Sequence, residues 1–253
     1  MFTEADRSHL LDKLIRRARA DKQIAAAAVV GSAARGAVDR WSDIDLALGL
    51  SDTADLVEVA HRWTDEIAAS VVVADTLDVW AGPVLYRVFL LHDSLQVDVS
   101  FWPAGTLAPT GAEPLVAVFG DVAAPTPSPS PDGHAALRWG WLYALHVRTA
   151  IARGRLWQAT LMLEGLRNQV VVLTCLRHGV DSHHGRGVDH LPAAVLERLA
   201  GTLPDRLSSP ALAAAYGMAL DMLADEAGHL DSDLATRLRD PFANLRTPTG
   251  TVS

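Results

Sequence analysis

The sequence predicts an α+β domain followed by an all-α domain. Up to residue 102, short apolar runs and alternating patterns typical of strands dominate, whereas apolar residues recur at helical spacing after residue 133. Residues 103–133, between these regions, hold most of the prolines. We therefore expect domains at residues 1–105 and 134–253, joined by a proline-rich linker or surface loop at residues 106–133.

The elements of the first domain follow from apolar spacing and from the turn signals between the apolar segments. Leu10, Leu11 and Leu14 fall on one side of a helix expected at residues 4–22. The run from Ile24 to Val30 is apolar throughout, as in a strand covered on both faces. Further along we expect a turn at 31–39 and a strand at 44–50. A helix capped by Asp52 or Thr53 should then run to about residue 69. It should be followed by a strand at 71–81 and a hairpin of strands 84–91 and 95–101.

Helical spacing accounts for most of the second domain, and the chain contains no internal repeat. We expect helices at about residues 134–152, 156–178, 192–200, 210–227 and 231–239.

Composition and charge exclude several classes of protein. Of the 253 residues, 49% are hydrophobic, which is too high for a disordered chain. The net charge of −8 argues against binding of duplex nucleic acid and mildly favours a cationic partner. Cys175 is the only cysteine, so an internal disulfide and a cysteine-based zinc site are excluded and a cytoplasmic setting is expected. Neither a signal peptide nor a membrane-spanning segment is apparent, so we expect no membrane association.

The segment GSAARGAVDRWSDIDLAL, residues 31–48, carries the most informative pattern. Asp43 and Asp45 point to the same side of a strand, because side chains alternate between its faces. Two neighbouring carboxylates repel each other, and a hard divalent cation such as Mg²⁺ relieves that repulsion. An edge strand with two solvated aspartates is the alternative, but the apolar neighbours Ile44 and Leu46 favour a buried strand.

A Gly-Ser turn precedes this strand. Gly31 allows the backbone to approach a phosphate group closely, and Ser32 adds a hydroxyl and N–H donors. Arg35 can add positive charge to the same phosphate-binding turn. The Walker A lysine motif is absent, so the chain is not predicted to be a P-loop protein.

A third acidic residue, Asp98, occurs in the expected strand LQVDVSF. Gln96, Asp98 and Ser100 share one face of that strand, which in an ordinary hairpin would be only its polar face. If this strand lies beside residues 44–50, Asp98 completes a carboxylate cluster with Asp43 and Asp45. Two metal ions held by three carboxylates form the arrangement used for in-line phosphoryl or nucleotidyl transfer.

The combination of G-S-x-x-x-G, S-D-I-D-L and V-D-V resembles the DNA polymerase β-type nucleotidyltransferase superfamily. The layout is similar to the aminoglycoside and lincosamide antibiotic nucleotidyltransferases, and the motif resemblance covers residues 24–102. It implies a nucleotidyltransferase-type mixed sheet with flanking helices, followed by an all-α helical bundle.

The resemblance also assigns roles to individual residues. It implies that Gly31 and Ser32 bind phosphate. We also count Arg35 and Ser42 of the S-D-I-D-L motif among the candidate nucleotide-binding residues. Asp43, Asp45 and Asp98 are the implied metal ligands, and Asp98 can also help to deprotonate the acceptor hydroxyl. The implied cofactor is Mg²⁺, and the implied co-substrate is ATP or another NTP.

In the second domain, the expected helix 156–178 contains Glu164 on a mostly apolar sequence. In the related antibiotic enzymes an acid of the helical domain can act as general base or substrate ligand, so Glu164 is the candidate from this half. Alternatively, Glu164 forms an ion pair with Arg167. Trp157, which lies on the same side of the helix as Glu164, then packs in the core. The histidines His178, His183, His184 and His190 can suggest zinc, but their glycine-rich segment is more typical of a surface loop.

These observations favour a Mg²⁺-dependent enzyme that transfers a nucleotidyl group to a small hydroxylated molecule. One alternative keeps the chemistry but uses a protein acceptor, as toxin–antitoxin nucleotidyltransferases do. Another is a non-catalytic nucleotide-binding module, although three retained carboxylates argue against it.

Overall fold

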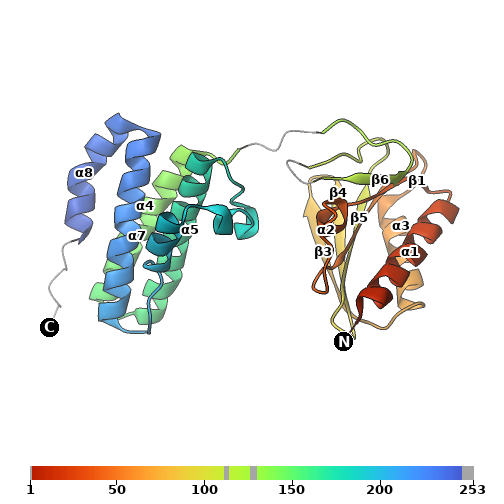
Figure 1. The fold of residues 1–253 in the computed structure, drawn as a ribbon, viewed down its shortest axis with the longest axis horizontal. Coiled ribbons are helices and arrows are strands. Elements are labelled where there is room, and N and C mark those ends of the chain that lie inside the picture. The colour runs from red at the N-terminus through yellow and green to blue at the C-terminus, as the bar shows by residue number, and fades with distance from the viewer. Residues whose placement is uncertain (1, 111–113, 126–129, 247–253) are drawn as a thin grey trace. The chain divides into compact units, whose positions relative to one another are not determined.

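The computed structural model describes residues 2–110, 114–125 and 130–246, and it divides into two compact units between residues 129 and 130 (Figure 1). The first unit therefore takes in most of the segment 106–133 that the sequence assigns to a linker. Residues 111–113 and 126–129 of that segment lie outside the described residues.

The first unit is a six-stranded sheet with helices. Its elements are α1 (Glu4–Ala20), β1 (Ile24–Val29), α2 (Gly31–Ala34), β2 (Ile44–Leu50), α3 (Leu56–Ala68), β3 (Val73–Ala81), β4 (Val84–Leu91), β5 (Gln96–Trp102) and β6 (Val116–Phe119). The strand order is β3-β4-β5-β2-β1-β6, and β2 and β5 run parallel while all other neighbours are antiparallel. The predicted mixed sheet is confirmed.

Helices α1 and α3 cover one face of this sheet (Figure 1). Their apolar sides, with Leu10 and Leu14 on α1 and the fully buried Trp63 on α3, pack against strand residues such as Leu46 and Phe101. Alternation along each strand sends the intervening side chains to the opposite face. The opposite face therefore carries the polar residues of β2 and β5.

The structure differs from the sequence-based expectation at three places in this unit. Residues Val116–Phe119, which were assigned to the linker, form strand β6 and pair with β1. Helix α3 begins later than expected, because Asp55 rather than Asp52 or Thr53 caps it by accepting a hydrogen bond from the N–H of Glu58. The predicted turn after β1 contains the short helix α2.

The second unit is helical. It comprises α4 (Gly133–Ala152), α5 (Leu156–His178), α6 (Ala193–Ala200), α7 (Ser209–Leu230) and α8 (Ser232–Arg246), with short 3₁₀ turns at His183–Gly185 and Val188–His190. The five expected helices are thus all present, and an apolar core formed mainly by α4, α5 and α7 holds them together. Close packing depends on glycine, since Gly140 lies against Leu223 and Gly165 against the ring of Tyr143. Within the described ranges, no helix combines the length and apolar character needed to cross a membrane.

Candidate active site

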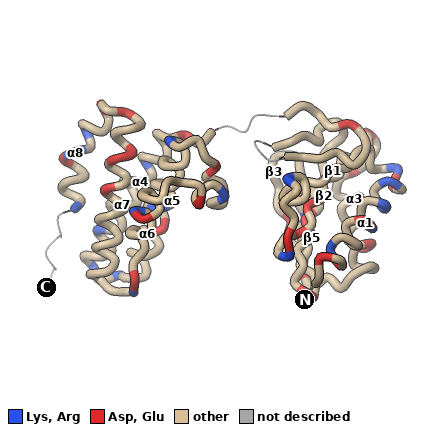
Figure 2. Tube along the Cα trace, in the orientation of Figure 1, with Lys and Arg blue, Asp and Glu red and all other residues tan. Residues whose placement is uncertain are grey.

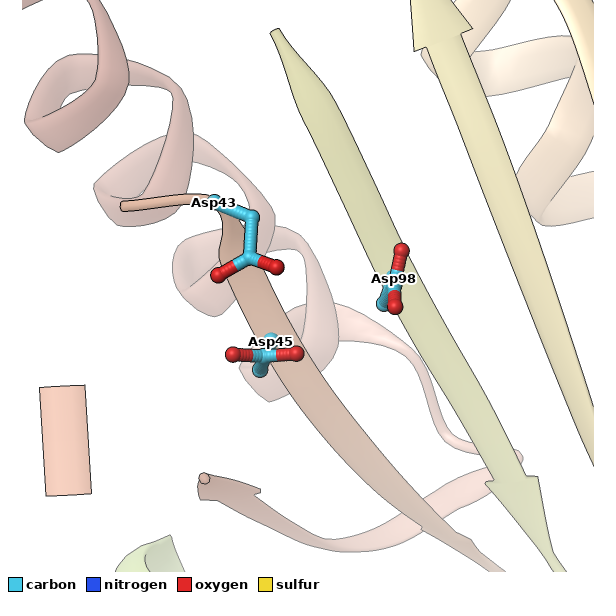
Figure 3. Close-up of side chains that lie close together, drawn as sticks. All are labelled: Asp43, Asp45 and Asp98. Atoms are coloured by element: carbon cyan, nitrogen blue, oxygen red, sulfur yellow. The ribbon is translucent and has the colours of Figure 1, made fainter. Parts of the chain in front are cut away.

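Three carboxylates meet on the open face of the sheet, the face that α1 and α3 leave uncovered. Asp45 on β2 lies directly beside Asp98 on β5 in the parallel ladder. Asp43, two residues before Asp45, points to the same side (Figure 3). One carboxylate oxygen from each residue lies within 4.8 Å of those of the other two. The structure therefore brings together the three residues that the sequence predicted as metal ligands.

The apolar residues between these carboxylates fix their direction. Ile44 and Leu46 flank Asp45, Val97 and Val99 flank Asp98, and all four are at most 2% exposed. These side chains enter the core beneath α1 and α3. Because successive strand residues face opposite ways, burying them holds Asp45 and Asp98 on the open face.

The carboxyl group of Asp98 has a raised pKa. Burial raises its pKa to about 6, and the nearby negative charge of Asp43 adds to the rise. Hydrogen bonds from the Gln96 amide, at 3.0 and 3.2 Å, act in the opposite direction. Full ionisation of the three carboxyl groups is unfavourable without a nearby cation, and a hard divalent cation such as Mg²⁺, which prefers oxygen ligands, would make it favourable.

The stability of the metal-free protein should depend on pH through Asp98. Its folded-state pKa of about 6 lies above the ordinary value of 3.8, so the folded state binds the proton more tightly than the unfolded state. The associated stabilisation is complete below pH 4 and is lost as the pH rises through 6. Asp98→Asn should therefore stabilise the protein at pH 7.5 by on the order of 2 kcal/mol and have little effect below pH 4.

Urea unfolding of wild type and Asp98→Asn in EDTA, at pH 4 and pH 7.5, measures this effect. An equal stability difference between the two proteins at both pH values would contradict it.

The Gly-Ser turn lies directly against Asp45. Gly31 has a φ of +62°, and a Cβ atom at this position would lie 2.1 Å from Asp45 Oδ2. The adjacent Ser32 hydroxyl is buried and has no hydrogen-bond partner among the described residues. A backbone that approaches a carboxylate this closely, next to an unused hydroxyl, fits a phosphate group held beside the metal ligands.

Ser42 serves the loop that leads into β2. Its hydroxyl accepts a hydrogen bond from the N–H of Asp39 at 2.9 Å and donates one to Asp39 Oδ1 at 3.1 Å. The hydroxyl of this predicted nucleotide-binding residue is thus engaged in shaping the loop. Arg35 is exposed at the end of α2, and its contribution to phosphate binding stays a prediction.

The candidate residues of the helical unit lie on its surface. Trp157 is 71% exposed, so it does not pack in the core, and Glu164 is exposed on the same helix. Within the described part of the unit, no ion pair joins Glu164 to Arg167, although the sequence allowed one. The proposed role of Glu164 at the substrate stays a prediction.

Among the described residues, the histidine-rich segment does not bring three potential metal ligands close together. His183 and His184 stack with ring centroids 4.0 Å apart. Across residues 2–110, 114–125 and 130–246, the aspartate cluster is the one group of three or more potential ligands close enough to share a metal ion.

Comparison with known proteins relates part of the first unit to a known family. Residues 11–80 match the family model of the nucleotidyltransferase domain, and this range includes Gly31, Ser32, Asp43 and Asp45. No curated protein sequence gives a significant match. Among solved structures, an aminoglycoside 6-adenyltransferase from Bacillus subtilis is similar, with 10% sequence identity, a TM-score of 0.40 and coverage of 97% of this chain and 99% of that chain. The family match and the motif it contains support a nucleotidyltransferase domain of the DNA polymerase β-type superfamily in the first unit, and with it the activity of a transferase of phosphorus-containing groups.

Proposed function

We propose that the protein transfers a nucleoside monophosphate, with ATP as the expected donor, to a hydroxyl group of a small molecule such as an aminoglycoside or a lincosamide. The observation that carries this proposal is the carboxylate cluster of Asp43, Asp45 and Asp98 beside the glycine turn at Gly31. Metal ligands and a phosphate-binding backbone at one place are the parts that nucleotidyl transfer requires.

The residues of the cluster suit bound Mg²⁺. Asp43, Asp45 and Asp98 would hold it through carboxylate oxygens, and the bound metal supplies positive charge that polarises the α-phosphate. Gly31 lets the backbone approach the β- and γ-phosphates, and the Ser32 hydroxyl has a free donor for a phosphate oxygen.

Asp98 is the proposed proton acceptor. Its carboxylate belongs to the cluster at which the acceptor hydroxyl would lose its proton. In the proposed step the acceptor oxygen forms a bond to the α-phosphorus, and its proton passes to Asp98. The bond between the α-phosphorus and the bridging oxygen breaks, and pyrophosphate leaves.

A small acceptor is supported by the charge of the chain and by its helical unit. The net charge of −8 favours an acceptor that carries amino groups. Helix α5 of the helical unit presents an exposed tryptophan, Trp157, and an exposed carboxylate, Glu164. A cationic sugar can stack on the tryptophan ring and pair with the carboxylate. A substrate role for Glu164 predicts that Glu164→Gln changes the steady-state kinetics on the true acceptor.

The proposal is tested with purified protein, Mg²⁺ and ATP labelled at the α-phosphate, against a panel of aminoglycosides, lincosamides and the protein itself. The matched control is the double variant Asp43→Asn/Asp45→Asn. We expect label on a small molecule, with none in the control. Label on protein alone would instead favour a protein-modifying enzyme. Mg²⁺-dependent ATP binding without transfer to any acceptor would favour a non-catalytic nucleotide-binding module.

A further inference from the structure

The loop that precedes Asp43 is attached to helix α1 by a buried arginine. We propose that Arg7 is a positioning residue, which fixes the first metal ligand of the site by binding the backbone that leads into it. This inference rests on the proposed function, because it takes Asp43 to be a metal ligand.

Asp43 needs support that the other two carboxylates do not. Asp45 and Asp98 sit within β2 and β5, where hydrogen bonds to neighbouring strands fix the backbone. Asp43 lies before the first residue of β2, and the ladder between β2 and β5 begins only at Ile44 and Val97. The placement of its carboxylate therefore depends on the loop that comes before it.

Arg7 reaches that loop from α1. Its Nη1 donates to the carbonyl oxygen of Asp39 at 2.5 Å and to that of Ser42 at 3.4 Å. The Ser42 carbonyl belongs to the peptide bond that joins Ser42 to Asp43, and a peptide unit moves as a rigid plane. A guanidinium that holds this carbonyl therefore restrains the Cα atom of Asp43.

Hydrogen bonds within the loop, between residues 39 and 42, carry the restraint from Arg7 to the residue before Asp43. Asp39 Oδ1 accepts hydrogen bonds from the N–H of Trp41 at 2.8 Å and from the Ser42 hydroxyl at 3.1 Å. The Ser42 hydroxyl in turn accepts one from the N–H of Asp39 at 2.9 Å. Because these bonds tie residues 39–42 into one turn, Arg7 anchors the turn as a unit.

The burial of Arg7 sets it apart from the other basic residues that occur along α1 (Figure 2). Arg7 is only 6% exposed, its hydrogen-bond acceptors are the carbonyl oxygens of Asp39 and Ser42, and its positive charge also helps to lower the pKa of the Asp39 carboxyl group. A buried guanidinium whose acceptors are backbone carbonyls is costly to desolvate. Burial of the apolar side of α1, which includes Leu10 and Leu14, offsets that cost and holds Arg7 in place.

Arg7 acts through the loop rather than on substrate. Helix α1 covers the face of the sheet opposite the carboxylates, so Arg7 is a positioning and not a catalytic residue. Its loss should weaken metal binding more than it changes the affinity for the nucleotide.

The test compares Arg7→Met with Arg19→Met in the full-length protein. Arg19 is a matched control, because it lies on the same helix and also donates to a backbone carbonyl, that of Val118 at 2.7 Å, in β6 rather than in this loop. The probe is Mn²⁺, whose binding is followed by electron paramagnetic resonance, with thermal unfolding recorded for each variant. We expect Arg7→Met to weaken Mn²⁺ binding at least roughly tenfold, the size of effect seen when a residue behind a metal ligand is lost, and Arg19→Met to bind as wild type does.

Arg7→Lys provides a second variant in case Arg7→Met does not fold. Lysine keeps the charge but has a shorter reach and no planar fork, so we expect an intermediate loss of Mn²⁺ affinity. Wild-type Mn²⁺ affinity in a folded Arg7 variant would overturn the inference and leave the proposed function intact. If wild type does not bind Mn²⁺, or binds it equally well after Asp45→Asn, the metal site proposed above fails, and this inference fails with it.

Discussion

Asp45→Asn should lower the rate of nucleotidyl transfer by about a thousandfold and leave the fold unchanged. Asn has the shape of Asp, but it removes one of three charges that would hold Mg²⁺, next to the turn at Gly31 that would hold phosphate. Loss of one charge-stabilising group at a transition state typically costs a factor of 10²–10³, and here the metal itself should bind more weakly. Folding should not suffer, because the change removes a like charge from a partly buried cluster.

The measurement is the rate of label transfer at saturating Mg²⁺, together with thermal unfolding. Asp52→Asn is the matched control: Asp52 lies just beyond the other end of β2, is exposed and is not part of the cluster. It makes the same chemical change and should have wild-type activity. Near-wild-type transfer by Asp45→Asn would remove Asp45 from the metal site.

Gly31→Ala should have the second largest effect, with a loss of transfer of at least about a hundredfold. The added methyl group would lie 2.1 Å from Asp45 Oδ2, so either the turn or the carboxylate must move. The φ of +62° is also unfavourable for alanine, which adds roughly 1–2 kcal/mol of backbone strain. A displacement of about 1 Å in the phosphate-binding turn is enough to cost two orders of magnitude in rate.

Gly82→Ala separates these two causes. Gly82 has a nearly identical φ of +59° and lies outside the G-S-x-x-x-G motif, and a Cβ atom there would have no neighbour within 4 Å. The two variants should therefore lose similar stability from backbone strain, while only Gly31→Ala loses activity. Equal activities for the two would show that the close approach of Gly31 to Asp45 has no functional role.

The sequence predicts the strands and the face of each carboxylate because both depend on local patterns. Alternation within DID and VDV is enough to place Asp45 and Asp98 each on one face of its own strand. It does not give the order of strands in the sheet, so the meeting of Asp98 with Asp45 could be stated only as a condition. The parallel pairing of β2 with β5, which joins residues 53 positions apart, decides it.

Three features were not predicted from the sequence: strand β6, the residue that caps α3, and the contact of Arg7 with the loop. They depend on contacts between distant residues, or on a choice between neighbouring residues that are equally suitable. Strand β6 is short and lies in a proline-rich region, although the apolar run from Leu115 to Phe119, which ends at a glycine, was a usable signal. Asp52, Thr53 and Asp55 are all good helix caps, and the local sequence does not show that Asp55 is the one used. Arg7 is one of several arginines on an amphipathic helix, and nothing local shows that it binds a loop 32 residues away.

The pairing of β2 with β5 has a consequence for folding as well as for chemistry. If β5 slipped by one residue against β2, every side chain of β5 would change faces, and Asp98 would enter the apolar layer that now holds Val97 and Phe89. Burying a carboxylate there without a partner is strongly unfavourable, so the slipped sheet is destabilised relative to the native one. The same carboxylate therefore favours the native register of β5 over the slipped one. An apolar residue at position 98 would remove the proposed catalytic group and would also no longer destabilise the slipped register.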